Sequence, residues 1–266
     1  MADRPAISVR GLRKQYGDRV ILDHLDLDVE AGETLVILGG SGSGKSTLLR
    51  CMIGLETPDA GRVEVLGQDL HAASIAEGRA LRQRLGMAFQ GSALFGSMTV
   101  EQNLDLPLAE FTDLPPSTRH LIIQIKLALV GLDEAAGRYP SELSGGMQKR
   151  AAFARAMALD PDILFCDEPS AGLDPITAAG LDHLLIRLRD VFGMTLVVVT
   201  HEMDSAFAIA DRLALMHGGR FITSGTPDEV RASDDPMVRR FLDRQPEDAT
   251  SRGDAWQRLW QDRARQ

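Results

Sequence analysis

The chain has 266 residues, of which 44% are hydrophobic and 25% are charged, and its formal net charge is -9. These values are ordinary for a globular protein of one or two domains that needs no disulfide or metal to complete its core. The negative charge argues against general nucleic-acid binding, which favours a basic face, so we expect no nucleic-acid partner.

Two further sequence features predict where in the cell the chain is located. Cys51 and Cys166 lie in apolar surroundings, which is typical of buried, reduced thiols in a cytosolic protein. No apolar run approaches the roughly 18 residues of a membrane span, and the start MADRPAISVRG lacks the apolar core of a signal peptide. We therefore expect a cytosolic chain that works at a membrane, if it does so, through a partner.

Apolar patterns in the first part of the chain predict strands and one helix. The segment LDLDV (Leu25 to Val29) alternates with period two, as a half-buried strand does. The run TLVILGG (Thr34 to Gly40) is continuously apolar, which is typical of a fully buried parallel strand. A helix is predicted from about Ser46, and RVEVLG (Arg62 to Gly67) resembles another strand.

Three later apolar strands each end in a polar residue, and they are Leu85 to Gln90, Ile163 to Glu168 and Thr195 to Glu202. The carboxyl ends of such strands bind ligands in open α/β sheets. A hairpin is predicted over Leu213 to Gly225, turning at Gly218-Gly219. Residues 91–158 are mainly helical in pattern, with one helix over Leu121 to Leu132, and they predict a helical insert in the α/β core.

The last 21 residues differ from the rest. We expect one domain over residues 1–245, followed over 246–266 by a polar linker and a short amphipathic helix. Trp256, Leu259 and Trp260 are spaced i, i+3, i+4, so they share one face of that helix. Exposed tryptophans usually find a partner. We expect the tail to dock on another subunit or an accessory protein; packing on its own domain is the alternative.

A glycine-rich loop follows the predicted strand at Thr34 and matches the phosphate-binding pattern G-x-x-x-x-G-K-S. Glycines let successive backbone N–H groups turn towards phosphate oxygens, and the following helix adds its positive end. Lys45 would reach the β- and γ-phosphates, Ser46 would offer its hydroxyl to Mg²⁺, and Thr47 would lie at the α-phosphate. A Gly/Ser-rich turn before a helix is the alternative. The candidate nucleotide-binding residues here are Gly39, Gly40, Ser41, Gly42, Ser43, Gly44, Lys45, Ser46 and Thr47.

Four strand-end residues and one tyrosine could complete a nucleotide site. Asp167 would hold the Mg²⁺ hydration shell, and Glu168 would act as general base on the attacking water. Gln90 could bridge Mg²⁺ and that water, and His201 could donate to the γ-phosphate. Tyr16 could stack on adenine. Each has a structural alternative, because acids and a lone histidine often end strands and a tyrosine before Gly-Asp is often a turn residue.

A second anion site is indicated by LSGGMQKRAAFARAMAL, in which Ser144-Gly145-Gly146 open a helix. Helix N-termini bind anions. A chain that binds one nucleotide does not need two phosphate sites of its own.

Taken in order, these motifs resemble those of the ATP-binding-cassette ATPases over nearly all of residues 5–245. The resemblance implies a P-loop NTPase fold of the ABC ATPase type, α/β, with a mixed core sheet, an antiparallel β subdomain and a helical subdomain. It also implies ATP and Mg²⁺ as cofactors. The residues that carry over are the A-loop Tyr16, the Q-loop Gln90, the signature Ser144-Gly145-Gly146, the D-loop Leu173-Asp174 and the switch His201.

The resemblance also explains the second anion site. In this family two subunits meet head to tail, and the phosphate loop of one and the signature of the other hold the same ATP. A monomer is then expected to hydrolyse ATP poorly. Met147 stands where many members have glutamine, and Gly172 stands where alanine is common. Neither change removes a catalytic group.

Several segments resemble more narrowly the ATPase subunits of Mla/Mce-type phospholipid transporters, and they are Gly91 to Leu108, LSGGMQKRAAFARA, EPSAGLDPIT and DPMVRRFLD. The implied partners are a second copy, an integral-membrane permease, an MCE-domain lipid-binding protein and a small STAS-domain protein, at the cytoplasmic side of the bacterial inner membrane. A permease helix would dock near Phe95 and Met98. The alternatives are a small-solute importer ATPase, a cassette protein of translation or DNA repair, and a P-loop kinase, for which Ser144 would be dispensable.

Overall fold

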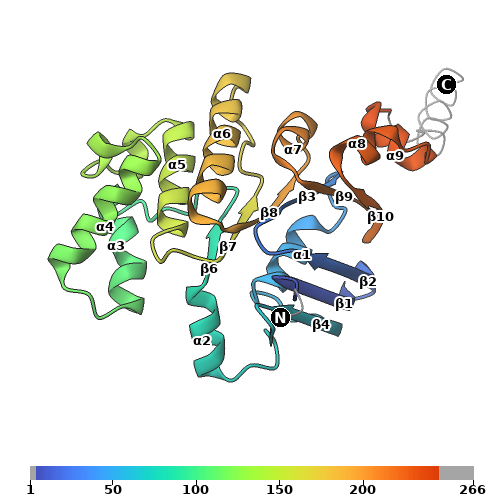
Figure 1. The fold of residues 1–266 in the computed structure, drawn as a ribbon, viewed down its shortest axis with the longest axis horizontal. Coiled ribbons are helices and arrows are strands. Elements are labelled where there is room, and N and C mark those ends of the chain that lie inside the picture. The colour runs from blue at the N-terminus through green and yellow to red at the C-terminus, as the bar shows by residue number, and fades with distance from the viewer. Residues whose placement is uncertain (1–3, 246–266) are drawn as a thin grey trace, which may run out of the picture.

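The computed structural model describes residues 4–245, which form two β-sheets with a helix between them and a helical region at one side (Figure 1). The larger sheet has the strand order β10-β9-β3-β8-β7-β6. Its strands are β3 (Thr34–Gly39), β6 (Leu85–Ala88), β7 (Ile163–Asp167), β8 (Thr195–Thr200), β9 (Arg212–His217) and β10 (Arg220–Gly225). All pairs are parallel except β9 with β10, so the sheet is mixed, as expected.

The central strands bury both faces, which explains why their sequences are continuously apolar. Every residue of β3, β7 and β8 is buried. In β3 the side chains alternate, so that Val36 and Leu38 pack into one core cluster and Leu35 and Ile37 into the other. This strand therefore connects the two hydrophobic cores of the molecule.

The smaller sheet is antiparallel, with the order β2-β1-β4-β5. Its strands are β1 (Ile7–Tyr16), β2 (Arg19–Val29), β4 (Ala60–Val65) and β5 (Gln68–Asp69). The alternation predicted for LDLDV is confirmed, because Leu25, Leu27 and Val29 are buried and Asp26 is exposed. The predicted strand over RVEVLG ends earlier, at Val65, because Leu66 and Gly67 both have positive φ and turn the chain into β5.

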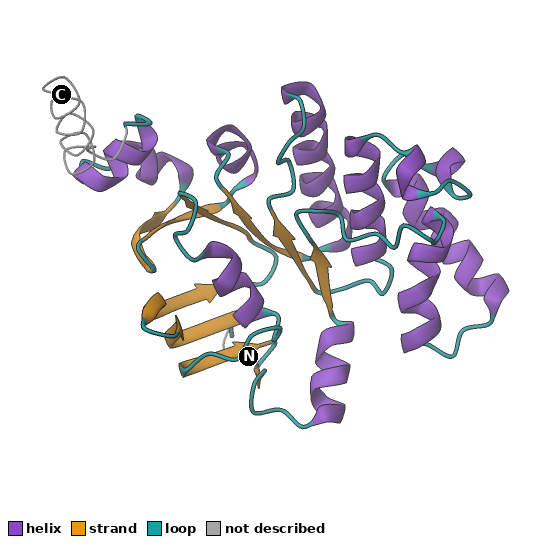
Figure 2. Ribbon diagram, turned by 180° about the vertical axis from the view of Figure 1, so that it is seen from behind, coloured by secondary structure: helices purple, strands orange, loops and turns teal. Residues whose placement is uncertain are grey.

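Helix α1 (Lys45–Met52) lies between the two sheets (Figures 1 and 2). Its apolar side chains pack with residues from both sheets in one cluster. The other face of the large sheet is covered by α5 (Gly145–Ala156), α6 (Pro175–Phe192) and α7 (Met203–Ile209), as Figure 2 shows. Strand β3 is therefore followed, after a short loop, by the N-terminus of α1, a helix that packs against both sheets.

The remaining helices lie at the two ends of the larger sheet (Figure 1). Beside α5 are α3 (Val100–Phe111), α4 (Pro116–Leu129) and the short 3₁₀ turns η1 (Asp133–Ala135) and η2 (Pro140–Glu142). At the other end are α8 (Pro227–Ala232) and α9 (Pro236–Leu242). Helix α2 (Ile75–Gln83), which the apolar pattern did not predict, precedes β6 and begins with a Ser74–Glu77 capping box.

Over residues 4–245, no helix is both long enough and apolar enough to cross a bilayer. The predicted tail helix with Trp256, Leu259 and Trp260 lies outside the described residues.

Candidate functional site

The loop between β3 and α1 is built so that only glycine fits at several positions. A Cβ on Gly39 would lie 2.4 Å from the carbonyl oxygen of Met216 on β9. Gly42 and Gly44 have φ values of 76° and 106°, which L-residues other than glycine rarely adopt. The glycines therefore allow the tight loop by which the chain passes from β3 into α1.

Lys45 and Ser43 give this loop a cationic and polar interior. The ammonium of Lys45 is buried and donates to the carbonyls of Gly39 at 2.8 Å and Gly40 at 3.1 Å. Burial lowers the pKa of Lys45, while the carboxylates of Glu168 and Asp167 raise it. Ser43 Oγ is buried with no hydrogen-bond partner among residues 4–245. A glycine-rich loop at a helix N-terminus, with a buried ammonium and an unpartnered hydroxyl, fits a phosphate group.

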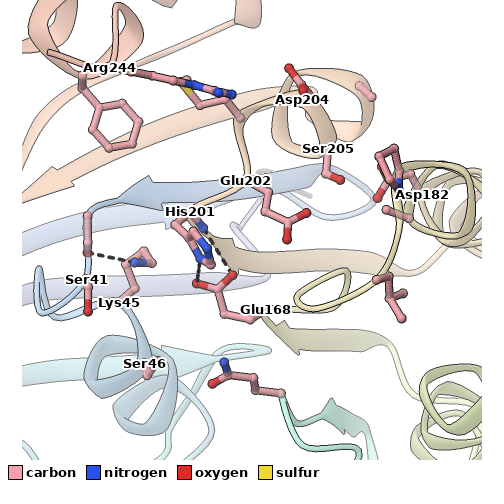
Figure 3. A pocket seen from close by; sticks show the side chains of 18 of the residues that line it. Ser41, Lys45, Ser46, Glu168, Asp182, His201, Glu202, Asp204, Ser205 and Arg244 are labelled. Carbon is pink, nitrogen blue, oxygen red and sulfur yellow. Dashed lines mark hydrogen bonds and ion pairs between the residues drawn. The ribbon is translucent and has the colours of Figure 1, made fainter. Parts of the chain in front are cut away.

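The loop opens into a cleft of about 1110 Å³ (Figure 3). The predicted site residues that line it are Gly40, Ser41, Gly42, Lys45, Ser46, Gln90, Glu168 and His201. These residues come from the carboxyl ends of β3, β6, β7 and β8, which the parallel register brings to one edge of the sheet. The structure thus brings eight of the predicted residues, from four strand ends, together in one cavity.

Ser46 and Asp167 form a pair at the base of this edge. Ser46 Oγ donates to Asp167 Oδ1 at 3.2 Å. Burial raises the pKa of Asp167, and the bond from Ser46 partly offsets that effect. No group of three or more His, Cys, Asp or Glu side chains suited to a metal occurs within the described part of the chain. One hydroxyl and one carboxylate beside a phosphate loop fit Mg²⁺, which takes its other ligands from phosphates and water.

Glu168 is the most constrained carboxylate of the cleft. Its Oε2 accepts from the Thr200 hydroxyl at 3.0 Å and from the His201 backbone N–H at 3.3 Å, and its Oε1 lies 2.9 Å from His201 Nδ1. Glu168 is 8% exposed and has a φ of 48°. These contacts fix the carboxylate at the cavity wall, as Figure 3 shows. Thr200 was not among the residues predicted from the sequence, although it directly precedes His201 at the same strand end.

Gln90 and Glu168 are both contacted by one lysine that was not predicted from the sequence. The ammonium of Lys149, in α5, donates to the backbone carbonyls of both residues. Lys149 lies in the run QKRAAFARA, and charged residues in such a run usually indicate a solvent-exposed helix face. Lys149 is instead 8% exposed.

The signature residues lie elsewhere. Ser144 caps the N-terminus of α5 by accepting from the backbone N–H of Met147 at 3.3 Å, and it is exposed. Gly146 packs closely on α6, because a Cβ there would lie 2.7 Å from Thr177 Cγ2. Among the described residues that line the cleft, none belongs to Ser144-Gly145-Gly146. Within the described part of one subunit, the signature residues therefore do not share the cleft with the glycine-rich loop.

Tyr16 also lies outside the cleft, at the end of β1. Its ring is half-exposed, its hydroxyl donates to the Glu56 carboxylate, and the Lys14 ammonium lies 5.5 Å from the ring centroid. The bond to Glu56 raises the pKa of Tyr16, and the Thr47 hydroxyl lowers it. An exposed aromatic ring of this kind could stack on an adenine.

Comparison with known proteins identifies the family to which the chain belongs. Residues 22–171 match the sequence profile described as ABC transporter. Over 237 residues the chain is 41% identical to the intermembrane phospholipid transport system ATP-binding protein MlaF of Escherichia coli (strain K12), covering 89% of this chain and 88% of that protein. It is 40% identical to the "Probable ribonucleotide transport ATP-binding protein mkl" of Mycobacterium leprae, covering 89% of this chain and 68% of that one.

Two solved structures share the fold. One is cbiO1 from Clostridium perfringens, part of the ABC transporter complex cbiONQ, with a TM-score of 0.80 and 29% identity over 90% of this chain and 95% of that one. The other is a bacterial ABC transporter cassette solved as a dimer, with a TM-score of 0.77 and 30% identity over 83% of this chain and 98% of that one. The chain therefore belongs to the ABC transporter family, as one of its ATP-binding, ATP-hydrolysing cassette subunits.

Proposed function

We propose that this ATPase powers phospholipid transport between the inner and outer membranes of a bacterial envelope. The observation that carries the proposal is the 41% identity to MlaF, which extends over nearly the full length of both chains. The relative named for ribonucleotide transport is almost as similar, but the match leaves about a third of that protein uncovered. The ATPase of a solute transporter is thus the second candidate.

For hydrolysis we propose the following division of work. The loop over 39–47 and Tyr16 bind the nucleotide, with Lys45 at the β- and γ-phosphates. Ser46, Asp167 and Gln90 hold Mg²⁺, which would neutralise the developing charge on the phosphates when bound. Glu168 takes a proton from the attacking water, and Thr200 and His201 fix its carboxylate for that task.

The second anion site supports a composite arrangement of two subunits. Ser144 is exposed at a helix N-terminus and does not line its own cleft. In a head-to-tail pair, each signature would meet the γ-phosphate held by the partner, giving two shared ATP sites. A related cassette was solved as a dimer.

The further partners belong to the same proposal. A permease would supply the membrane path, with an MCE-domain protein binding lipid and a STAS-domain protein binding the ATPase. The chain would then work at the cytoplasmic face of the inner membrane. Exposed Phe89, Phe95 and Leu106 lie on and before α3, where a permease segment could dock.

Purification of the complex tests this proposal. The tagged chain is isolated from membranes in mild detergent, and mass spectrometry identifies the proteins and lipids that accompany it. A permease with an MCE-domain protein and enriched phospholipid is expected. A permease with a solute-binding protein and no lipid enrichment would favour the solute transporter, and isolation without any membrane protein would contradict both readings.

A further inference from the structure

Lys149 is a buried cation that binds no carboxylate directly within residues 4–245. Its ammonium donates to two backbone carbonyl oxygens, that of Gln90 and, at 3.2 Å, that of Glu168. Burial lowers the pKa of Lys149, while the nearby charges of Glu168, Asp167 and Glu202 raise it. A buried ammonium is costly unless it is hydrogen-bonded, and here both acceptors belong to residues of the candidate site.

The two carbonyls come from different strands. Gln90 follows β6 and Glu168 follows β7, two neighbouring parallel strands. Each residue lies just beyond the end of its strand, where hydrogen bonds between β6 and β7 no longer set the distance between the two backbone segments. Lys149 bridges the two backbone carbonyls where no strand-to-strand hydrogen bond joins these segments, and it thereby fixes the backbone separation of Gln90 and Glu168.

A second basic side chain of α5 holds the same loop. Arg155 donates to the carbonyls of Ser92 at 3.2 Å and Ala93 at 2.7 Å. Ser92 and Ala93 have positive φ values of 61° and 51°, so this segment needs outside contacts to keep its shape. Lys149 and Arg155 together anchor the loop after β6 to one helix.

That helix is the one that begins at the signature. Ser144 caps α5, and Lys149 follows one turn after the first helical residue, Gly145. One rigid element therefore carries an exposed anion site at its end and holds the candidate base and the Gln90 loop along its side.

From this geometry we infer that Lys149 is a positioning residue for hydrolysis, which holds Gln90 and Glu168 in register with the signature helix of the same subunit. The inference rests on the proposed roles of Gln90 and Glu168. Movement of α5 towards a partner's nucleotide would then move the hydrolytic groups of its own subunit, so that the two ATP sites of a dimer are coupled. Lys149 itself does not touch the nucleotide in this account.

The test compares Lys149→Met with Lys126→Met in the purified full-length chain. Lys126 is a matched control, because it is also buried in the helical region but pairs with Asp160 outside the cleft. We expect Lys149→Met to lower kcat about 10- to 100-fold, the scale of a 1 Å misplacement of reacting groups. The KM for ATP and the affinity for a fluorescent ATP analogue should be nearly unchanged, and half-saturating Mg²⁺ should rise. Lys126→Met should change none of these, even if both variants lose thermal stability.

Two more conservative variants of Lys149 separate loss of its hydrogen bonds from loss of folding. Lys149→Arg retains donors for two carbonyls and should restore most of the turnover. If Lys149→Met does not fold, Lys149→Gln, which retains one amide donor group, should still show the same separation of kcat from KM. The inference is overturned if Lys149→Met turns over as fast as Lys126→Met, or if nucleotide affinity falls by the same factor as kcat.

The assay uses no permease or lipid, so failure of the phospholipid proposal would leave its result unaffected. Glu168→Gln is measured in parallel. If that variant keeps full turnover, the assignment of the base fails, and the role of Lys149 fails with it for a distinguishable reason.

Discussion

Glu168 and His201 are joined by a 2.9 Å contact between Oε1 and Nδ1. When Nδ1 carries the proton, it donates to the carboxylate, and Nε2 of a neutral ring can then only accept. His201 was expected to donate to the γ-phosphate. While Nδ1 donates to Glu168, His201 can also donate from Nε2 only as an imidazolium, so the proposed roles of Glu168 and His201 depend on one shared hydrogen bond.

Glu168→Gln is expected to bind ATP, to lower turnover by about 10²-fold or more, and to accumulate an ATP-bound dimer. The amide keeps a similar shape but cannot take a proton from water. Steady-state ATPase assays and size-exclusion chromatography with ATP check both effects. An unchanged rate removes Glu168 as the base.

Lys45→Ala is expected to weaken ATP binding by about 10-fold or more, because it removes the ammonium from the phosphate loop. Titration calorimetry with ATP under Mg²⁺-free and Mg²⁺-containing conditions measures the change, with thermal unfolding as a check on folding. Undiminished affinity contradicts the assignment of the loop.

Much of this site was predictable because its signals are local. Buried parallel strands need continuous apolar residues, and Gly39, Gly42 and Gly44 are required by backbone geometry within one loop. Strand β1 was harder to predict, because register shifts between Val9 and Tyr16 interrupt its alternation. The contacts of Lys149 were not predictable, since its partners Gln90 and Glu168 are 59 and 19 positions away. Only the folded chain shows that this charge is buried.

Ser144→Asp separates helix capping from phosphate binding. Aspartate caps a helix as well as serine does, so α5 should remain folded, but its charge would repel the partner's γ-phosphate. We expect unchanged ATP affinity and loss of turnover, with Ser144→Asn as the neutral control that also caps. Full turnover by Ser144→Asp would contradict a role of Ser144 at the partner's γ-phosphate.

Gly146→Ala should destabilise the protein, whereas Gly145→Ala should not. A Cβ on Gly146 lies 2.7 Å from Thr177 Cγ2, while a Cβ on Gly145 has its nearest neighbour, Leu173 Cδ2, at 3.7 Å. Overpacking costs about 1–3 kcal/mol, and an alanine in a helix otherwise gains up to about 1 kcal/mol over glycine. Chemical denaturation measures the difference. Equal unfolding free energies would show that Thr177 moves aside freely.

Asp182→Asn is expected to stabilise the protein at neutral pH by about 1 kcal/mol. Asp182 Oδ1 is buried without a hydrogen-bond partner within residues 4–245, and burial raises its pKa above the ordinary 3.8. The folded state therefore binds this proton more tightly than the unfolded state, so the ionised carboxylate costs stability as pH rises through the raised pKa.

The gain from Asp182→Asn should accordingly shrink as the pH falls towards 4, and Asp204→Asn, at an exposed position of the same cleft, serves as the control. Urea unfolding at several pH values measures both variants. A pH-independent gain would mean that charge burial is not its cause.

Phospholipid movement driven by ATP hydrolysis can be measured in a reconstituted complex. The complex purified with its permease is placed in vesicles containing a fluorescent phospholipid, and lipid movement is followed after ATP is added. We expect ATP-dependent movement of the phospholipid with the wild-type chain and none with Glu168→Gln. ATP turnover by the intact complex without any ATP-dependent movement of phospholipid would contradict the proposed function.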